Sequence, residues 1–161
     1  MKVSFINPDI GDGQKGIVAK SAAVLPVFKG AKPSPSFAAY DALSGKQVSA
    51  AAKAGGVTGA AGKSAQVFGP ANTKTNRIVV TGCGKRDGFD AEKFGARVTK
   101  ALLMSGETTL VIHLDGADMT PTDGARAALG AVLAAYRFDK YRTKLAKDKK
   151  PSLKNVKIAI E

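Results

Sequence analysis

The sequence contains no tryptophan, one cysteine and one histidine, and the scarcity of the last two limits the chemistry that the chain can carry. A lone Cys83 rules out an internal disulfide and gives no support for an oxidising compartment. A lone His113 leaves no convincing Ser/His/Asp or Cys/His set for nucleophilic catalysis. No apolar run approaches the roughly 20 residues that cross a bilayer, and Asn7, Pro8 and Asp9 interrupt the apolar start that a signal peptide needs. We therefore expect a soluble, cytoplasmic protein with no membrane partner.

The remaining composition is that of a globular domain. A chain of 161 residues is long enough to bury one real core, and 44% of its residues are hydrophobic against 24% charged. Because only seven Phe and three Tyr are present, the core must consist largely of Val, Ile, Leu and Ala.

Positive charge is abundant and unevenly placed. The formal net charge is +12, and residues 137–161 alone carry nine Lys or Arg against three acids, which is half of the total. Such a segment can attract nucleic acid through counterion release. Blocks of like charge commonly lie in solvated tails, so a basic connector is the interpretation that we favour.

The first half of the chain predicts three strands and two short helices. The strands are expected at residues 2–6, 17–28 and 64–68, and the helices at residues 36–43 and 46–54. Pro26 suggests that the second strand ends there or lies near an edge of the sheet. Four glycines make residues 55–63 a loop.

The second half alternates apolar strands with longer helices. Residues 77–82 and 108–114 are expected to be neighbouring interior strands, and a last strand covers residues 156–160. Asp90 and Thr120 are good N-caps for helices that extend to Ser105 and Phe138. The second of these helices is expected to bury one apolar stripe: Ala125, Ala128, Leu129, Val132 and Tyr136. This order predicts a single α/β domain with a mixed, mainly parallel sheet flanked by helices.

A glycine-containing turn, Val80-Thr-Gly-Cys-Gly-Lys85, follows a strand and precedes a helix, where α/β proteins place phosphate-binding turns. The match to known fingerprints fails, because Arg86 stands where a Walker A motif needs Ser or Thr, and Asp87 where a dinucleotide motif needs Gly. A tight turn with positive φ explains the glycines more simply.

Three further features have a functional and a structural interpretation. His113 and Asp115 share a strand face and resemble two metal ligands, but a third ligand is not evident and a hydrogen-bonded core histidine is more common. Cys83 is either a low-pKa thiol near Lys85 or a buried, inert residue, which we favour. Three aromatic residues interleave with cations near the end of the last helix: Tyr136, Phe138 and Tyr141. They could stack on nucleic-acid bases. In the structural interpretation, Tyr136 and Phe138 complete the packing of the helix and the charged side chains extend over them.

The run Ala128–Lys144, an apolar helix ending in Tyr-Arg-Phe-Asp-Lys-Tyr-Arg-Thr-Lys, resembles the end of the N-terminal domain of the leucyl (cytosol) aminopeptidase family. Two other segments resemble that domain in the right order, the early strand and turn at residues 24–30 and the central strand at residues 77–85. Residues 156–160 resemble the strand that leads toward the catalytic part. The resemblance thus covers essentially the whole chain.

The resemblance implies a fold similar to macro domains and a division into residues 1–143, the N-terminal α/β domain, and residues 144–161, a basic linker and the first strand toward a catalytic domain. In that family a larger C-terminal domain holds two divalent metals, zinc or manganese, and removes N-terminal residues from peptides. No position here matches its motifs, so we assign no catalytic, cofactor-binding or metal-binding residue, and no cofactor, to this chain.

We accordingly expect a non-catalytic, structural or interaction domain without aminopeptidase activity of its own. Its expected partners are the catalytic domain of the same protein and, as in the family, further copies in a hexamer assembled mainly through catalytic domains. Two alternatives stay open: a weak, non-specific nucleic-acid-binding module, and a macro-type binder of nucleotides or ADP-ribose.

Overall fold

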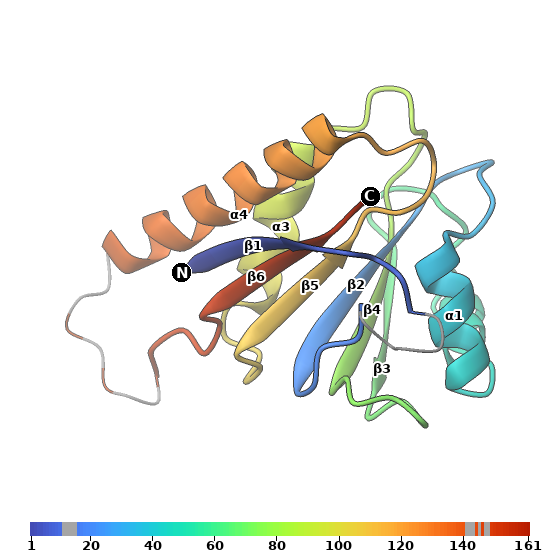
Figure 1. Cartoon of the computed structure of the whole chain (residues 1–161), viewed down its shortest axis with the longest axis horizontal. Helices are drawn as coiled ribbons and strands as arrows, with labels where there is room; N and C mark the ends of the chain where they lie inside the picture. Colours follow the sequence, from blue (N-terminus) through green and yellow to red (C-terminus); the bar gives the residue numbers. More distant parts are fainter. Residues whose placement is uncertain (11–15, 141–143, 145, 147–148) are drawn as a thin grey trace.

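The computed structural model describes residues 1–10, 16–140, 144, 146 and 149–161. Its centre is one six-stranded sheet (Figure 1). The strands are β1 (Lys2–Ile6), β2 (Ser21–Val27), β3 (Ser64–Phe68), β4 (Arg77–Gly82), β5 (Thr109–His113) and β6 (Asn155–Ala159). Their order across the sheet is β1-β6-β5-β2-β4-β3, and every neighbouring pair is parallel except the antiparallel pair β3–β4. The predicted α/β class with a mixed, mainly parallel sheet is confirmed.

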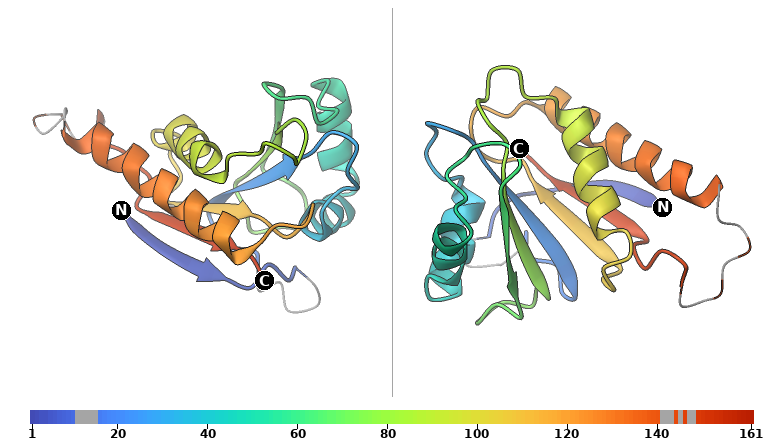
Figure 2. Two further views of the ribbon diagram at one scale, coloured as in Figure 1. Left: turned by 90° about the horizontal axis from the view of Figure 1, so that it is seen from above. Right: turned by 180° about the vertical axis from the view of Figure 1, so that it is seen from behind.

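Helices cover both faces of the sheet. They are α1 (Pro35–Leu43), α2 (Gln47–Ala54), α3 (Ala91–Leu102) and α4 (Pro121–Lys140). The first two pack on one face and the last two on the other (Figure 2). Among the described residues, no helix combines the length and the apolar character that crossing a lipid bilayer requires.

Both predicted N-caps are present. The Asp90 side chain accepts a hydrogen bond from the Lys93 amide at 3.1 Å. Thr120 and Asp123 cap each other, because the Asp123 carboxylate accepts from the Thr120 amide and the Thr120 hydroxyl accepts from the Asp123 amide.

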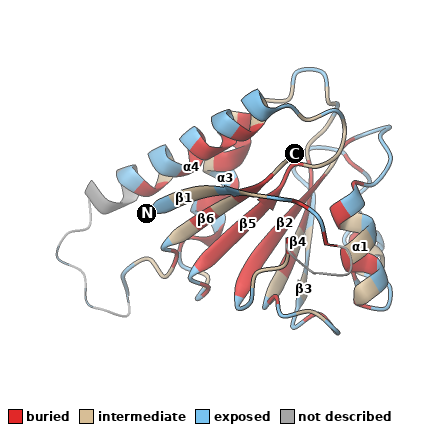
Figure 3. Ribbon diagram, in the orientation of Figure 1, coloured by how far each residue is buried: buried red, intermediate tan, exposed pale blue. Residues whose placement is uncertain are grey.

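Strand β2 occupies the middle of the sheet, and its first six residues are buried (Figure 3). Because side chains alternate along a strand, Ala22 and Val24 enter the core under α3 and α4, whereas Ala23 and Leu25 enter the core under α1 and α2. A run of small and branched residues without polar alternation is what a strand covered on both faces requires.

This placement corrects the predicted pairing of β4 with β5, while β2 ends at Val27, one residue after Pro26. β4 and β5 are interior strands but not neighbours, since β2 lies between them. Pro26 is tolerated in a central strand because the pairing of β2 with β5 ends at Val24, although pairing with β4 continues to Val27. The strand is also shorter than residues 17–28.

The last strand is part of the same sheet, because β6 lies between β1 and β5. Before it, Leu153 is buried in the core, and the Lys154 amide donates to the Thr108 carbonyl at 2.9 Å. The basic linker expected from residue 144 onward is therefore packed into the domain at its end, where Leu153 is buried. Lys144, Lys149 and Lys150 are exposed as expected, while residues 145, 147 and 148 lie outside the described part.

Helix α4 turns a different side to the core than its apolar pattern predicts. Between residues 121 and 136, where side-chain burial is described, the buried positions of α4 carry only small residues: Gly124, Ala127, Ala128, Gly130, Ala131 and Ala135. Four of the five residues of the expected buried stripe are instead exposed: Ala125, Leu129, Val132 and Tyr136. The reason is close packing, because a Cβ atom at Gly130 would overlap the Glu92 carbonyl oxygen of α3. Only small side chains let the two helices approach so closely.

Candidate functional site at the carboxyl edge of the sheet

Parallel α/β sheets usually bind ligands at the carboxyl ends of their strands, and the one histidine lies there, at the end of β5. His113 Nδ1 is 2.9 Å from Ser36 Oγ, and Ser36 Oγ donates to Asp115 Oδ2 at 2.6 Å. A carboxylate only accepts and a serine has one proton, so the serine proton points to Asp115 and His113 Nδ1 carries the hydrogen that Ser36 accepts.

These three residues have the types of a serine-hydrolase triad but not its order. In a triad the histidine stands between serine and carboxylate and takes the serine proton. Here the serine stands between, and its proton is already held by Asp115. Ser36 and His113 are both buried, so no substrate reaches the hydroxyl. The arrangement connects β5 to α1 and does not activate a nucleophile.

Burial also sets the charge of this histidine. It lowers the pKa of His113 from 6.5 to about 3, so the ring is neutral at physiological pH. The Tyr40 ring packs edge-on against it, with centroids 5.4 Å apart, and burial raises the pKa of the Tyr40 hydroxyl to about 12. Both side chains serve the core, as the structural interpretation of His113 expects.

A metal site is not supported at His113 and Asp115. His113 Nδ1 and Asp115 Oδ2 face Ser36, and His113 Nε2 lies 3.5 Å from the Tyr40 hydroxyl. Of the side-chain N and O atoms of this pair, Asp115 Oδ1 alone is buried without a hydrogen-bond partner. No group of three or more His, Cys, Asp or Glu with the spacing of metal ligands occurs within the described ranges.

The three helices that follow β2, β4 and β5 start at this edge, and each has a carboxylate side chain at its N terminus. Asp115 accepts the Ser36 amide of α1, Asp90 caps α3 and Asp123 caps α4. Burial alone would raise the pKa of Asp123, but the hydrogen bonds from Thr120 and the Arg86 guanidinium, 2.6 Å away, hold it below its usual value. These helix ends would otherwise attract phosphate, and the chain satisfies them itself.

The glycine-containing turn after β4 is likewise occupied by backbone. The amides of Gly82, Cys83 and Gly84 donate to the carbonyls of Lys63, Val27 and Gly59 at 2.7–2.9 Å. A Cβ atom at Gly82 would overlap the Ala60 carbonyl oxygen, and Gly84 has a φ of +76°. Close loop packing and positive φ therefore explain the glycines. The adjacent cavity between Phe28, Ser34 and Gly116 has a volume of only about 10 Å³, the space of one water.

Cys83 is not an activated thiol. Burial raises its pKa to about 11, and the nearby Arg97 guanidinium offsets this only in part. Cys83 is half-buried rather than fully buried, and its raised pKa favours the structural interpretation of this residue.

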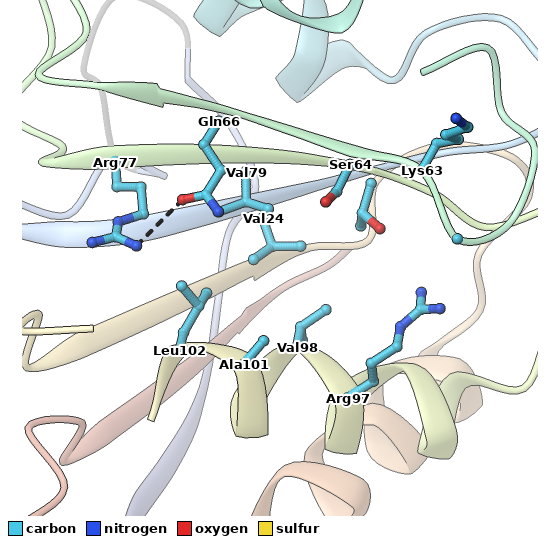
Figure 4. A pocket seen from close by; sticks show the side chains of 12 residues that line it. Val24, Lys63, Ser64, Gln66, Arg77, Val79, Arg97, Val98, Ala101 and Leu102 are labelled. Carbon is cyan, nitrogen blue, oxygen red and sulfur yellow. Dashed lines mark hydrogen bonds between the residues drawn. The ribbon is translucent and has the colours of Figure 1, made fainter. Parts of the chain in front are cut away.

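A larger cavity of about 230 Å³ lies on the face of the sheet that α3 covers, between α3 and the β3–β4 pair (Figure 4). Its α3 wall is apolar, formed by Val98, Ala101 and Leu102. At one end Arg77 donates to Gln66 and to Glu107, at 3.3 and 3.2 Å. Lys63 and Arg97 line the other end (Figure 4). None of its lining residues is a carboxylate, histidine or cysteine, and its charged groups are the cations Lys63, Arg77 and Arg97.

The aromatic and cationic stretch gives a mixed result. Tyr136 is 65% exposed, so it does not complete the packing of α4 as we expected. The side chain of Phe138 and all of Tyr141 lie outside the described residues.

Comparison with known proteins gives a consistent picture. The model of the cytosol aminopeptidase family, N-terminal domain, matches residues 24–145. The chain belongs to this family. A probable cytosol aminopeptidase of Caulobacter vibrioides is 37% identical over 162 residues, covering 99% of this chain and 31% of the relative. One of Rhizobium meliloti is 32% identical over 146 residues, covering 88% of this chain and 29% of the relative.

The fold agrees as well. A mutant of tomato leucine aminopeptidase superposes with a TM-score of 0.67 at 19% identity, covering 99% of this chain and 32% of that one. The chain thus spans about a third of the length of the aminopeptidases that it matches, and it corresponds to their N-terminal domain.

Sequence reasoning found His113, Asp115 and Cys83 but missed Ser36, the residue that joins the first two. Ser36 is 77 residues away from His113, and no local pattern links them. The one available signal was the Ser-Pro-Ser run at residues 34–36, which marks a helix start.

Proposed function

We propose that this chain is a non-catalytic N-terminal domain that acts by binding the catalytic part of a metal-dependent aminopeptidase. The observation that carries the proposal is the family match over residues 24–145, together with the place of the chain in relatives three times as long. The engagement of Ser36, His113 and Cys83 within the fold supports it.

In this proposal the chemistry belongs elsewhere in the enzyme. Two divalent metals in the catalytic domain activate a water and polarise the peptide carbonyl. The names of the relatives support a cytoplasmic location for the enzyme. Its assembly as a homo-oligomer is what the family resemblance implies. This chain supplies no ligand to the metals.

The activity test uses the pure chain with Zn²⁺ or Mn²⁺ and leucine p-nitroanilide. We expect no release of nitroaniline, whereas the full-length Caulobacter relative, assayed beside it, should release it. Metal-dependent release of nitroaniline that is proportional to the concentration of the chain, and that persists after repeated purification, would overturn the non-catalytic assignment.

A second candidate function, weak and non-specific DNA binding, is favoured by the net charge of +12 and by the exposed lysines before β6. Removing the chain after residue 143 would delete β6 from the interior of the sheet, so a truncation is a poor test. Replacing Lys144, Lys149 and Lys150 with Gln removes three charges without touching the sheet. A matched control replaces three exposed lysines elsewhere: Lys32, Lys53 and Lys100.

Fluorescence anisotropy with a random duplex at 50 and 200 mM salt separates the outcomes. We expect the affinity of the unmodified chain for DNA to fall steeply as the salt concentration rises. At 50 mM salt, the first triple variant should lose more affinity relative to the unmodified chain than the control variant does. Equal losses would place the binding on overall charge alone, and salt-independent binding would contradict this second function.

A further inference from the structure

The outer side of α4 is apolar, which is unusual for a helix on a protein surface. Leu129, Val132, Leu133 and Tyr136 are 50%, 42%, 41% and 65% exposed. The domain does not need these side chains for its own packing, because the glycines and alanines on the opposite side of α4 make the contacts with α3 and the sheet.

Helix α3 provides the comparison within the same chain. It buries Phe94, Val98 and Leu102 and exposes Lys93, Arg97 and Lys100, the ordinary division of a surface helix. Both helices lie on one face of one sheet, so the apolar outer side of α4 is a property of that helix and not of the layer.

The apolar surface extends from α4 to the edge strand β1. Phe5 is 56% exposed and pairs with Ile158, whose side chain lies under Gly124 at the start of α4. Phe5 therefore lies on the sheet face that α4 covers. Seen from above, α4 runs between α3 and β1 (Figure 2). With 100° of rotation per residue, Val132 and Tyr136 point away from the α3 contact at Gly130, toward the β1 side.

We propose that this surface, Phe5 together with Leu129, Val132, Leu133 and Tyr136, is where the catalytic part of the aminopeptidase packs. The inference rests on the proposed function above. Exposed apolar patches rimmed by polar residues are typical of interaction sites. The pale-blue outer side of α4 in Figure 3 marks where the partner would lie.

Three observations favour this occupant over a second copy of the chain. The matched relatives continue for about twice the length of this domain, and their further chain follows an N-terminal domain. In an enzyme built like these relatives, the further chain would start beyond the end of β6. This end touches both sides of the surface, since the Ile160 amide donates to the Ile6 carbonyl of β1 and the Ile160 side chain lies against Gly124 of α4. A second copy would bring a charge of +12 against a charge of +12.

The test labels one position on the surface. Val132→Cys is compared in two proteins, the isolated chain and a fusion of this chain to the catalytic part of the Caulobacter relative. N-ethylmaleimide labels accessible thiols, and peptide mass spectrometry reads position 132 separately from the half-buried Cys83. The control variant is Lys100→Cys on the exposed side of α3.

We expect labelling at position 132 to be at least tenfold slower in the fusion than in the isolated chain, and labelling at position 100 to be equal in both. An active fusion that labels equally at position 132 would overturn the surface but leave the proposed function. An inactive fusion with equal labelling would overturn the proposed function and the surface with it. Slow labelling in an isolated chain that elutes as a dimer would show that a second copy is the occupant.

Discussion

Gly130 is a buried position at which a single added carbon atom would clash with the backbone of a neighbouring helix. It faces α3, where a Cβ atom would overlap the Glu92 carbonyl oxygen and lie 2.8 Å from the carbonyl carbon and 3.0 Å from the Ala96 amide nitrogen. All three neighbours are backbone atoms, so no side chain can rotate away. Gly130→Ala must push α3 and α4 apart.

The size of the effect follows from two opposing contributions. Overpacking a tight contact costs roughly 1–3 kcal/mol, and moving two helix backbones belongs at the upper end of that range. Alanine returns about 1 kcal/mol through its better helix propensity. We therefore expect the free energy of unfolding to fall by about 2 kcal/mol, or roughly 4–8 °C in Tm for a chain of this size.

Chemical unfolding followed by far-ultraviolet circular dichroism measures this, since the chain has no tryptophan. The control is Ala125→Gly at an exposed position of the same helix, which isolates the propensity contribution and should cost about 1 kcal/mol. A Gly130→Ala protein as stable as the wild type, or more stable, would refute the close approach of α3 and α4.

Two further predictions concern the buried reactive groups. In the unfolded chain His113 binds a proton below about pH 6.5, whereas in the folded chain it does so only near pH 3. Between these two pH values the unfolded state binds more protons. The free energy of unfolding should therefore fall as the pH decreases, by up to about 1.4 kcal/mol per pH unit. Equilibrium unfolding between pH 6.5 and 4.5, above the range in which Asp41 and Asp123 titrate, should show this slope, and His113→Gln should flatten it; an unchanged slope in the variant would contradict a neutral, buried ring. With a pKa of about 11, the Cys83 thiol should react with a disulfide reagent at pH 8 at least a hundredfold more slowly in the folded chain than in urea, and equal rates would show that it is accessible.

Local signals predicted local structure well. Asp90 and Thr120 cap the helices that follow them because capping depends on neighbouring residues alone. The strands around Val79 and Val111 were evident because continuous apolar runs between turn residues have few other uses. These signals act over a few residues, and the chain carries them plainly.

What failed depends on residues far apart in the sequence. Apolar runs identify β4 and β5 but not their neighbours, so the position of β2 between them was not accessible. The side of α4 that faces the core was misjudged because hydrophobic patterns weight large residues, whereas the contact with α3 is made through Gly130 and Ala127. Ser36 was missed because its partners lie more than 70 residues away.

The carboxyl edge of the sheet and the outer side of α4 differ in what they offer to a partner. At the carboxyl edge, where an α/β sheet usually offers helix N termini and free amides to a ligand, Asp90, Asp115 and Asp123 occupy the helix ends and loop carbonyls occupy the amides. Such an edge is stable without a ligand and has little to bind one with. On α4 the reverse holds, because the core is satisfied by small residues and the large apolar side chains face outward. At the carboxyl edge the helix ends and amides are hydrogen-bonded within the domain, whereas α4 leaves large apolar side chains exposed. This combination is suited to packing against another protein surface, as the proposed role of a non-catalytic aminopeptidase domain requires.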